Sequence, residues 1–174
     1  MTGLRWWLKS AENGNAEAMN NVGVCFSSGQ GVEQDFTKAF EFFMKSANKG
    51  DIAAMNNAGL CYENDVGVTK DNTKAFGWYL KAAKNGNTDA MFYVGVCYDK
   101  GKGVTQDLNK AYEWYLKSAN NGNAVAMNSV AVCYSNGQGV TKDMTKSFDW
   151  YLKAANSGNA DAMFNVGWCY SNGQ

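Results

Sequence analysis

Residues 16–50 read AEAMNNVGVCFSSGQGVEQDFTKAFEFFMKSANKG, and this stretch decides the fold of the whole chain. Its first half carries four apolar residues at three- and four-residue spacing: Ala18, Val22, Cys25 and Phe26. Such spacing places side chains on one buried stripe of a helix. Gly29 stands where a left-handed residue commonly ends a helix. A second apolar series, from Ala39 to Ala47, predicts another helix, so the stretch predicts two helices joined by a short loop.

Polar residues that commonly cap helices precede both predicted helices. Asn15 and Asp35 occupy the N-cap positions, where a side-chain oxygen accepts a hydrogen bond from a backbone N–H of the first turn. The loop between the helices contains Gly-x-Gly-Val, which resembles a nucleotide-binding loop. That motif binds phosphates only between a strand and a helix. Here the preceding segment is helical and the loop appears four times, once in each whole unit, so we interpret it as a tight turn.

The same pattern recurs every 36 residues along the chain of 174 residues. The cysteines follow this period without exception: Cys25, Cys61, Cys97, Cys133 and Cys169. A single array, residues 1–174, therefore divides into a partial unit with only the second helix, four whole units, and a partial unit with only the first helix: 1–14, 15–50, 51–86, 87–122, 123–158 and 159–174. Periods of 20–50 residues are typical of stacked repeats. We predict an all-α solenoid of paired antiparallel helices.

The repeat resembles the Sel-one-like repeat (SLR) family, a branch of the tetratricopeptide-like superfamily. In the first whole unit the resemblance rests on Ala18, Val22-Gly23, Phe26, Gly29-x-Gly31-Val32, Asp35, Ala39, Phe42-Phe43 and Lys45-x-Ala47. It recurs in residues 101–122, GKGVTQDLNKAYEWYLKSANNG. Three residues depart from the pattern: Asp65, Ala131 and Ser147. The resemblance implies a right-handed superhelix of about ten helices and a non-enzymatic scaffold or adaptor that binds proteins.

The composition argues against several other functions. There is no histidine, which excludes Ser-His and Cys-His nucleophiles and histidine-ligated metals. Lys+Arg and Asp+Glu are 16 each, so no net positive charge favours nucleic acid or anionic membranes. No apolar run approaches the roughly 20 residues of a membrane helix. A row of aspartates lies one repeat apart and is interpreted as N-caps: Asp35, Asp71, Asp107 and Asp143. We expect no enzyme, no cofactor and no metal site.

One cysteine per repeat predicts free thiols. Some bacterial members of the resembling family carry two cysteines per repeat and bridge the two helices, which a single cysteine cannot do. Neighbouring units are expected about 10 Å apart, whereas a disulfide needs Cα atoms within roughly 7 Å. We therefore expect buried, reduced thiols that pack as small apolar groups. Unpaired thiols and a start without a visible signal peptide favour a reducing compartment such as the cytoplasm.

The second helix of each unit carries an aromatic column, which we interpret as packing between units rather than as a stacking platform: Trp6, Phe42, Trp78, Trp114 and Trp150. A lysine column near the end of the same helix is expected to face solvent and to suit the helix dipole: Lys45, Lys81, Lys117 and Lys153.

The face of the first helix opposite its buried stripe predicts a partner-binding surface. In the first whole unit this face holds positions 17, 20, 24 and 27, and in the resembling superfamily it lines a concave groove. The predicted contact residues are Asn20, Asn56, Phe92, Tyr93, Asn128, Phe164 and Trp168. Acidic residues border them: Glu17, Glu63, Asp89, Asp99 and Asp161. Asparagine donates and accepts, so a row of asparagines suits an extended peptide backbone. Alternatively, asparagine is simply a frequent exposed residue in a chain that contains 21 of them.

The partial units suggest a second function. A repeat buries its apolar face only against a neighbour. We therefore expect part of Trp6 or Trp7 to be exposed at one end, and Val166, Cys169 and Tyr170 to be partly uncovered at the other, with Trp168 beside them. Such faces predict either a segment of a longer array or a structural subunit that assembles end to end into an oligomer or fibre.

Overall fold

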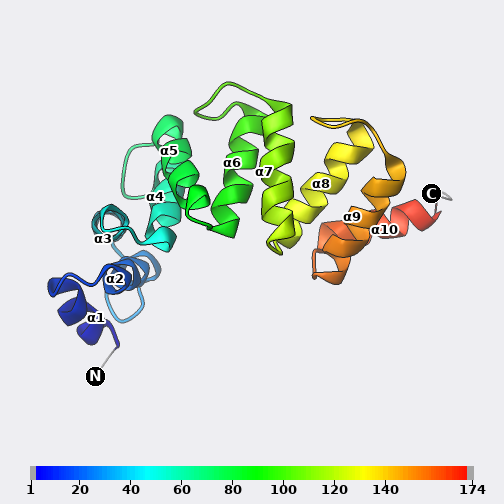
Figure 1. The fold of residues 1–174 in the computed structure, drawn as a ribbon. Helices are drawn as coiled ribbons and strands as arrows, with labels where there is room; N and C mark the ends of the chain where they lie inside the picture. The colour runs from blue at the N-terminus through cyan, green and yellow to red at the C-terminus, as the bar shows by residue number, and fades with distance from the viewer. Residues whose placement is uncertain (1–2, 172–174) are drawn as a thin grey trace. The chain divides into compact units, whose positions relative to one another are not determined.

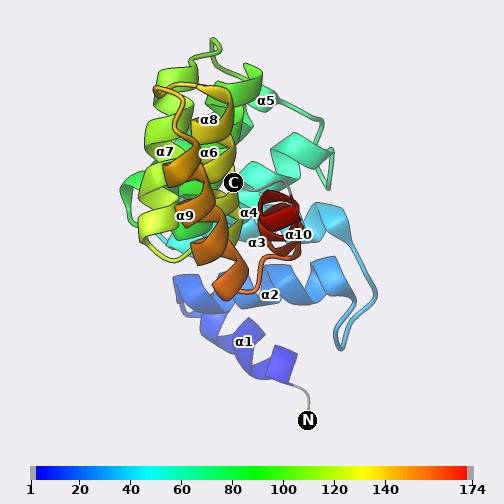
Figure 2. The ribbon, with the colours of Figure 1, turned by 90° about the vertical axis from the view of Figure 1, so that its right-hand side faces the viewer.

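The computed structural model describes residues 3–171, and this part of the chain folds into ten helices and no strand. The all-α repeat prediction is confirmed. Figures 1 and 2 show the helices from two directions. They are α1 (Gly3–Glu12), α2 (Ala16–Ser28), α3 (Phe36–Asn48), α4 (Ile52–Asn64), α5 (Asn72–Lys84), α6 (Thr88–Lys100), α7 (Leu108–Asn120), α8 (Ala124–Asn136), α9 (Met144–Asn156) and α10 (Ala160–Ser171).

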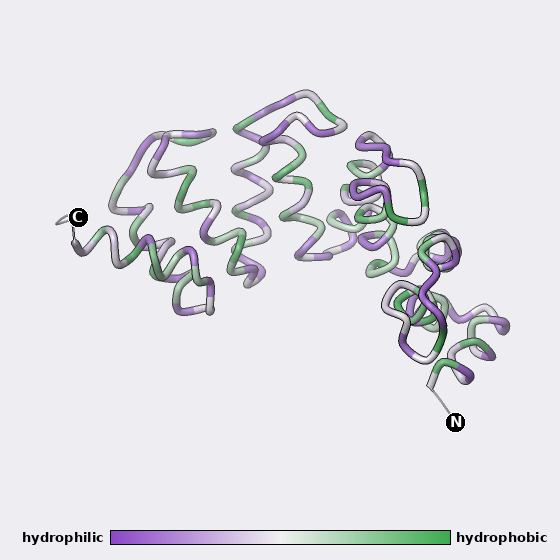
Figure 3. Tube along the Cα trace, turned by 180° about the vertical axis from the view of Figure 1, so that it is seen from behind, coloured by the Kyte–Doolittle hydropathy of each residue, from purple (hydrophilic) through white to green (hydrophobic). Residues whose placement is uncertain are grey.

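The helices form two compact units, α1–α5 and α6–α10, with the boundary between Asn87 and Thr88. Within each unit every helix packs against the next one along the chain. We call the even-numbered helices A helices and the odd-numbered ones B helices, because each whole repeat contains one of each. Along the chain trace, apolar and polar residues alternate within each helix, as one-sided burial requires (Figure 3).

The predicted helix caps are present. Asn15 Oδ1 accepts a hydrogen bond from the Ala18 N–H at 2.9 Å, and Asp35 Oδ1 accepts one from the Lys38 N–H at 2.9 Å. Gly29 ends α2 in the left-handed conformation, with φ 73°. These contacts satisfy backbone groups that have no partner inside the helix, which is why the same residue types recur in each repeat.

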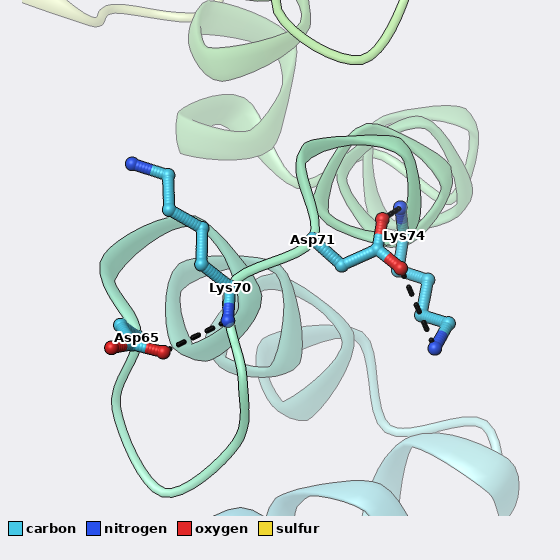
Figure 4. Close-up of polar contacts among 4 residues, drawn as sticks. All are labelled: Asp65, Lys70, Asp71 and Lys74. Carbon is cyan, nitrogen blue, oxygen red and sulfur yellow. Dashed lines mark hydrogen bonds and ion pairs between the residues drawn. The ribbon is translucent and has the colours of Figure 1, made fainter.

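The loop between α4 and α5 shows how Asp65 replaces glycine (Figure 4). Asp65 adopts the left-handed conformation with φ 60°, and its Oδ1 accepts a hydrogen bond from the Lys70 N–H at 2.9 Å. Beyond the loop, Asp71 Oδ1 accepts from the Lys74 N–H at 2.9 Å, and the Lys74 Nζ lies 3.4 Å from Asp71 Oδ2. The hydrogen bond from the Lys70 N–H to the Asp65 side chain therefore holds the two ends of the loop together. It offsets the less favourable left-handed backbone conformation of Asp65.

The four N-cap aspartates of the B helices predict acid sensitivity. The backbone N–H that each carboxylate accepts is the first cause of a lowered pKa, as at Asp107, where the Lys110 N–H is the donor. Because the folded pKa is lowered below 3.8, this stabilisation is complete above that pH and is lost as the pH falls through the folded value. The Asp107→Asn variant keeps a side-chain oxygen that can cap α7. We therefore expect acid to lower its urea unfolding midpoint less than it lowers the midpoint of the unmodified chain.

The control for this prediction is Glu41→Gln, which removes an exposed carboxylate from α3 without touching a cap. Its unfolding midpoint should fall with acid as steeply as that of the unmodified chain. If the acid profile of Asp107→Asn equals that of the control, the cap does not contribute to acid sensitivity.

The five cysteines are free and buried, as predicted. The expectation that Cys169 would be partly uncovered is wrong, because it is only 3% exposed in a cluster with Ala131 and Tyr151. Burial raises the pKa of Cys61 to about 11, and burial also raises that of Cys133 to about 11, with a smaller contribution from Asp99. A buried thiol with a raised pKa is a poor nucleophile, because the thiolate is the reactive form.

We expect the chain, unfolded in denaturant without a reductant, to titrate five thiols with Ellman's reagent. In native buffer the same groups should react slowly, at a rate that follows local opening of the helices. A denatured count below five would contradict the free state of the cysteines.

In the B-helix aromatic column, Phe42 and Trp150 pack against clusters that include residues of the preceding repeat, as predicted, whereas Trp6 is 61% exposed. The lysine column is exposed, as predicted. What the sequence reading missed is that each lysine lies over the aromatic ring three residues earlier. Lys45 Nζ is 5.1 Å from the centroid of the Phe42 ring, and Lys117 Nζ is 4.3 Å from that of Trp114. The lysines therefore shield half-buried rings from water as well as interacting with the helix end.

Candidate partner-binding surface

The exposed stripe of α2 is shifted by about one residue from the predicted one. Glu17, Val24 and Ser28 are exposed and Asn21 is half-buried, whereas Asn20 is only 9% exposed. The expected exposure of Asn20 is therefore wrong. The reason is that this position faces the neighbouring A helix rather than solvent, and there its Oδ1 accepts a hydrogen bond from Asn57 Nδ2 at 2.9 Å.

The second unit repeats this amide bond. Asn165 Nδ2 of α10 donates to Asn128 Oδ1 of α8 at 3.3 Å. In both units an asparagine of one A helix thus binds the asparagine one position further along in the following A helix. The Oδ1 of Asn56 is buried and has no hydrogen-bond partner among the described residues. The asparagine columns therefore connect neighbouring repeats, and their acceptor oxygens are largely turned toward the protein.

The remaining predicted contact residues lie in the second unit. Phe92 and Tyr93 are half-buried neighbours, with ring centroids 5.6 Å apart, and the Phe92 ring also packs against Tyr115. Phe164 is 74% exposed and Trp168 is 52% exposed, both on α10. The structure thus brings Phe92 and Tyr93 together on α6. Phe164 and Trp168 are the most exposed of the predicted contact residues.

The A helices enclose a hollow wherever two of them pack side by side within a unit. Between α2 and α4 it measures about 330 Å³ and is lined by Val24, Ser27, Ser28, Phe43, Asn57, Leu60, Cys61, Asn64 and Val66. Equivalent residues line about 440 Å³ between α8 and α10: Ser135, Asn136, Lys142, Met144, Tyr151, Asn165, Trp168 and Cys169. A smaller hollow of about 110 Å³ lies between α6 and α8, lined by Asp99, Tyr115, Ser129, Val132, Cys133 and Gln138. The repeated sequence therefore builds a repeated concavity.

One wall of each hollow is the ring of a B-helix residue, which is Phe43, Tyr115 or Tyr151. Burial, followed by the negative charge of Asp99, raises the pKa of the Tyr115 hydroxyl well above its ordinary value. Tyr79, the equivalent residue in the second whole repeat, donates its hydroxyl to Glu63 Oε2 at 2.8 Å. Phe43 is the member of this set without a hydroxyl.

Sequence reading did not find these tyrosine–carboxylate contacts. They join residues 16 apart, one at the end of an A helix and one in the middle of the following B helix. A signal was present in two repeats, because Glu63 and Asp99 stand 16 residues before Tyr79 and Tyr115.

The acidic residues expected around the surface have different surroundings. Glu17 and Asp161 are exposed, and Asp89 Oδ1 accepts from Asn123 Nδ2 at 3.0 Å. Asp99 Oδ2 lies 3.0 Å from Lys100 Nζ. Within α2 and α4, Glu17 and Glu63 are the charged residues, and neither helix contains a lysine or an arginine.

Within residues 3–171 no three Cys, Asp or Glu side chains gather in a way that could hold a metal ion. None of the described helices has the length and apolar character needed to cross a membrane. The chemistry that the surface offers is therefore that of apolar hollows, amides, hydroxyls and scattered carboxylates.

Comparison with known proteins gives a consistent picture. The model of the Sel1 repeat matches six consecutive segments: 2–15, 16–51, 52–87, 88–123, 124–159 and 160–174. A Sel1 repeat protein from Oxalobacter formigenes is 32% identical, with a TM-score of 0.92, over 98% of this chain and 68% of its own. A protective antigen of uropathogenic Escherichia coli with an SLR fold is 33% identical, with a TM-score of 0.91, over 98% of this chain and 36% of its own.

More distant structures share the fold alone. Cysteine rich protein B from Helicobacter pylori is 22% identical, with a TM-score of 0.59, over 75% of this chain and 93% of its own. A comparison with curated proteins found no significant match.

Proposed function

This chain belongs to the Sel1 repeat family, and on that premise we propose that it is an adaptor that binds a segment of a partner protein along its A helices. Sel1 repeats form a non-catalytic scaffold family whose members generally act in protein interactions. The observation that carries the proposal is the recurrence of the same hollow between neighbouring A helices, with similar lining residues each time.

The chemistry of these hollows suits an extended polypeptide. Successive side chains of an extended segment point in opposite directions, so alternate ones can enter a row of hollows. The hollows are also lined by small polar groups, such as Ser27 and Asn136, which can bind backbone N–H and C=O groups without selecting a side chain. The exposed Trp168 adds the kind of aromatic side chain that commonly dominates binding energy.

The test is selection of random linear peptides on the 174-residue chain, followed by affinity measurements with single variants. We expect Trp168→Ala and Phe92→Ala each to weaken the peptides that contact the second unit by about tenfold. Trp6→Ala, which removes a 61% exposed tryptophan from a B helix, is the matched control and should have no effect. Peptides that bind all A-helix variants as tightly as the unmodified chain would contradict the proposal.

A second candidate function is end-to-end assembly. On α10, Phe164 is 74% exposed and Tyr170 is 67% exposed, and on α1 Trp6 is 61% exposed. Exposed apolar faces of this kind favour a head-to-tail contact between copies, which would build a ring or an open helix. Light scattering over a range of concentrations should then show a mass that increases with concentration, and Tyr170→Ser should reduce it. A monomer at every concentration would contradict assembly.

A further inference from the structure

The hollow between α2 and α4 differs chemically from its two equivalents in the second unit. Its walls include four apolar side chains: Val24, Phe43, Leu60 and Val66. No charged side chain lines it, whereas Lys142 lines the hollow between α8 and α10 and Asp99 lines the hollow between α6 and α8. Phe43 also lacks the hydroxyl that Tyr115 and Tyr151 bring to those hollows.

Three of the polar side chains around this hollow each donate a hydrogen bond within the protein. Asn57 Nδ2 donates to Asn20 Oδ1 at 2.9 Å, and Asn64 Nδ2 donates to the Leu60 carbonyl oxygen at 3.0 Å. Ser28 Oγ donates to the Val24 carbonyl oxygen at 2.8 Å. Because no charged side chain lines the hollow, a charged group entering it would lose its hydration without gaining an oppositely charged partner.

We propose that the α2/α4 hollow is the anchor subsite of the partner-binding surface, and that it takes one large aliphatic or aromatic side chain of an extended segment. This inference rests on the proposed function. A volume of about 330 Å³ accommodates a single side chain of that size together with part of its backbone. The three other whole repeats carry a tyrosine where Phe43 stands, so we expect the preference for an apolar side chain at this hollow and not at its equivalents.

The negative charge of Glu17 near the hollow favours a basic group on the partner. Glu17 lies on the same exposed stripe of α2 as Val24, seven residues earlier, which is about 10 Å along a helix. Since Glu17 and Glu63 are the charged residues of α2 and α4, we expect a basic group of the partner near the anchor to be favoured.

The experiment uses the 174-residue chain and the peptides selected from the random linear library. Selected peptides should share a large apolar residue with a basic residue nearby. Phe43→Tyr should weaken them about fivefold, because it adds a hydroxyl to an apolar wall, and Leu60→Asp should weaken them about thirtyfold. Glu17→Gln should weaken them about threefold and reduce the dependence of affinity on salt.

Phe43→Tyr is the decisive variant because three sister repeats already fold with tyrosine there. Its matched control is Tyr151→Phe, which removes a hydroxyl from the α8/α10 hollow and should leave these peptides unaffected. If binding depends on Trp168→Ala but not on Phe43→Tyr or Leu60→Asp, the anchor subsite is wrong while the proposed function stands. If no peptide is selected, or none responds to any A-helix variant, both are overturned.

Discussion

Replacing Gly67 with alanine is expected to destabilise the chain by about 3 kcal/mol or more. Gly67 adopts φ 69°, a conformation that side chains with a Cβ rarely take. A Cβ built there would overlap the Phe36 carbonyl oxygen and would lie 2.6 Å from the Phe36 carbonyl carbon. Because the obstacle is backbone at the start of α3 rather than a movable side chain, the α4–α5 loop must shift as a whole.

The control separates the two causes of this loss. Gly50 has φ 97°, and nothing lies within 4 Å of a Cβ built on it. Gly50→Ala therefore carries only the backbone strain and should cost about 1 kcal/mol. Gly139 in the second unit repeats the overlap, with the Leu108 carbonyl oxygen, so Gly139→Ala should match Gly67→Ala. Urea unfolding measures all three, and equal losses for Gly50 and Gly67 would show that the overlap costs nothing.

The Gly-x-Gly-Val loop was correctly interpreted as a tight turn, but the sequence did not show the contact with the preceding repeat that also requires glycine there. Its interpretation as a tight turn follows from the helical segment before it and from its recurrence. The close approach of Gly67 to Phe36 joins the loop of one repeat to the B helix of the preceding repeat. The spacing of residues within a single repeat does not predict a contact between repeats, and the glycine itself is the one sequence signal of it.

The placement of Asn20 shows where helical spacing alone fails. Counting 100° per residue from the buried stripe treats the helix as having one partner. In a stacked repeat the A helix also contacts a neighbouring A helix, so its buried sector is wider than one stripe. Asn20 falls inside that wider sector and binds Asn57, whereas Val24 stays 42% exposed. One of the predicted contact residues, Asn20, is therefore turned toward the neighbouring A helix instead of solvent.

Replacing Gly59 with alanine is the second large expected effect, and here two physical arguments predict opposite signs. Alanine is the better helix former by about 1 kcal/mol, which favours a gain in stability. However, a Cβ on Gly59 would lie 2.6 Å from Cδ1 and Cε1 of Tyr79, whose side chain is fully buried. Because the ring has no free space to retreat into, we expect the overlap to prevail and the chain to lose about 2 kcal/mol.

Gly77 on α5 gives the matched control, because nothing lies within 4 Å of a Cβ built on it. Gly77→Ala should raise the free energy of unfolding by about 1 kcal/mol, so the two glycine-to-alanine changes should have opposite signs in urea unfolding. If both stabilise the chain, close packing of the ring against α4 does not limit stability.

The fourth whole repeat indicates how an alanine can be accommodated. Ala131 stands there in place of the glycine, and Ser147 of α9 donates its Oγ to the Ala131 carbonyl oxygen at 2.8 Å. In the second whole repeat the residue equivalent to Ser147 is Ala75. Adding Ala75→Ser to Gly59→Ala supplies the same hydroxyl at the same helix contact. The double variant should therefore recover about 1 kcal/mol of the loss. Ala75→Ser alone should not stabilise the chain, because with Gly59 the two helices lie too close together to leave room for the hydroxyl.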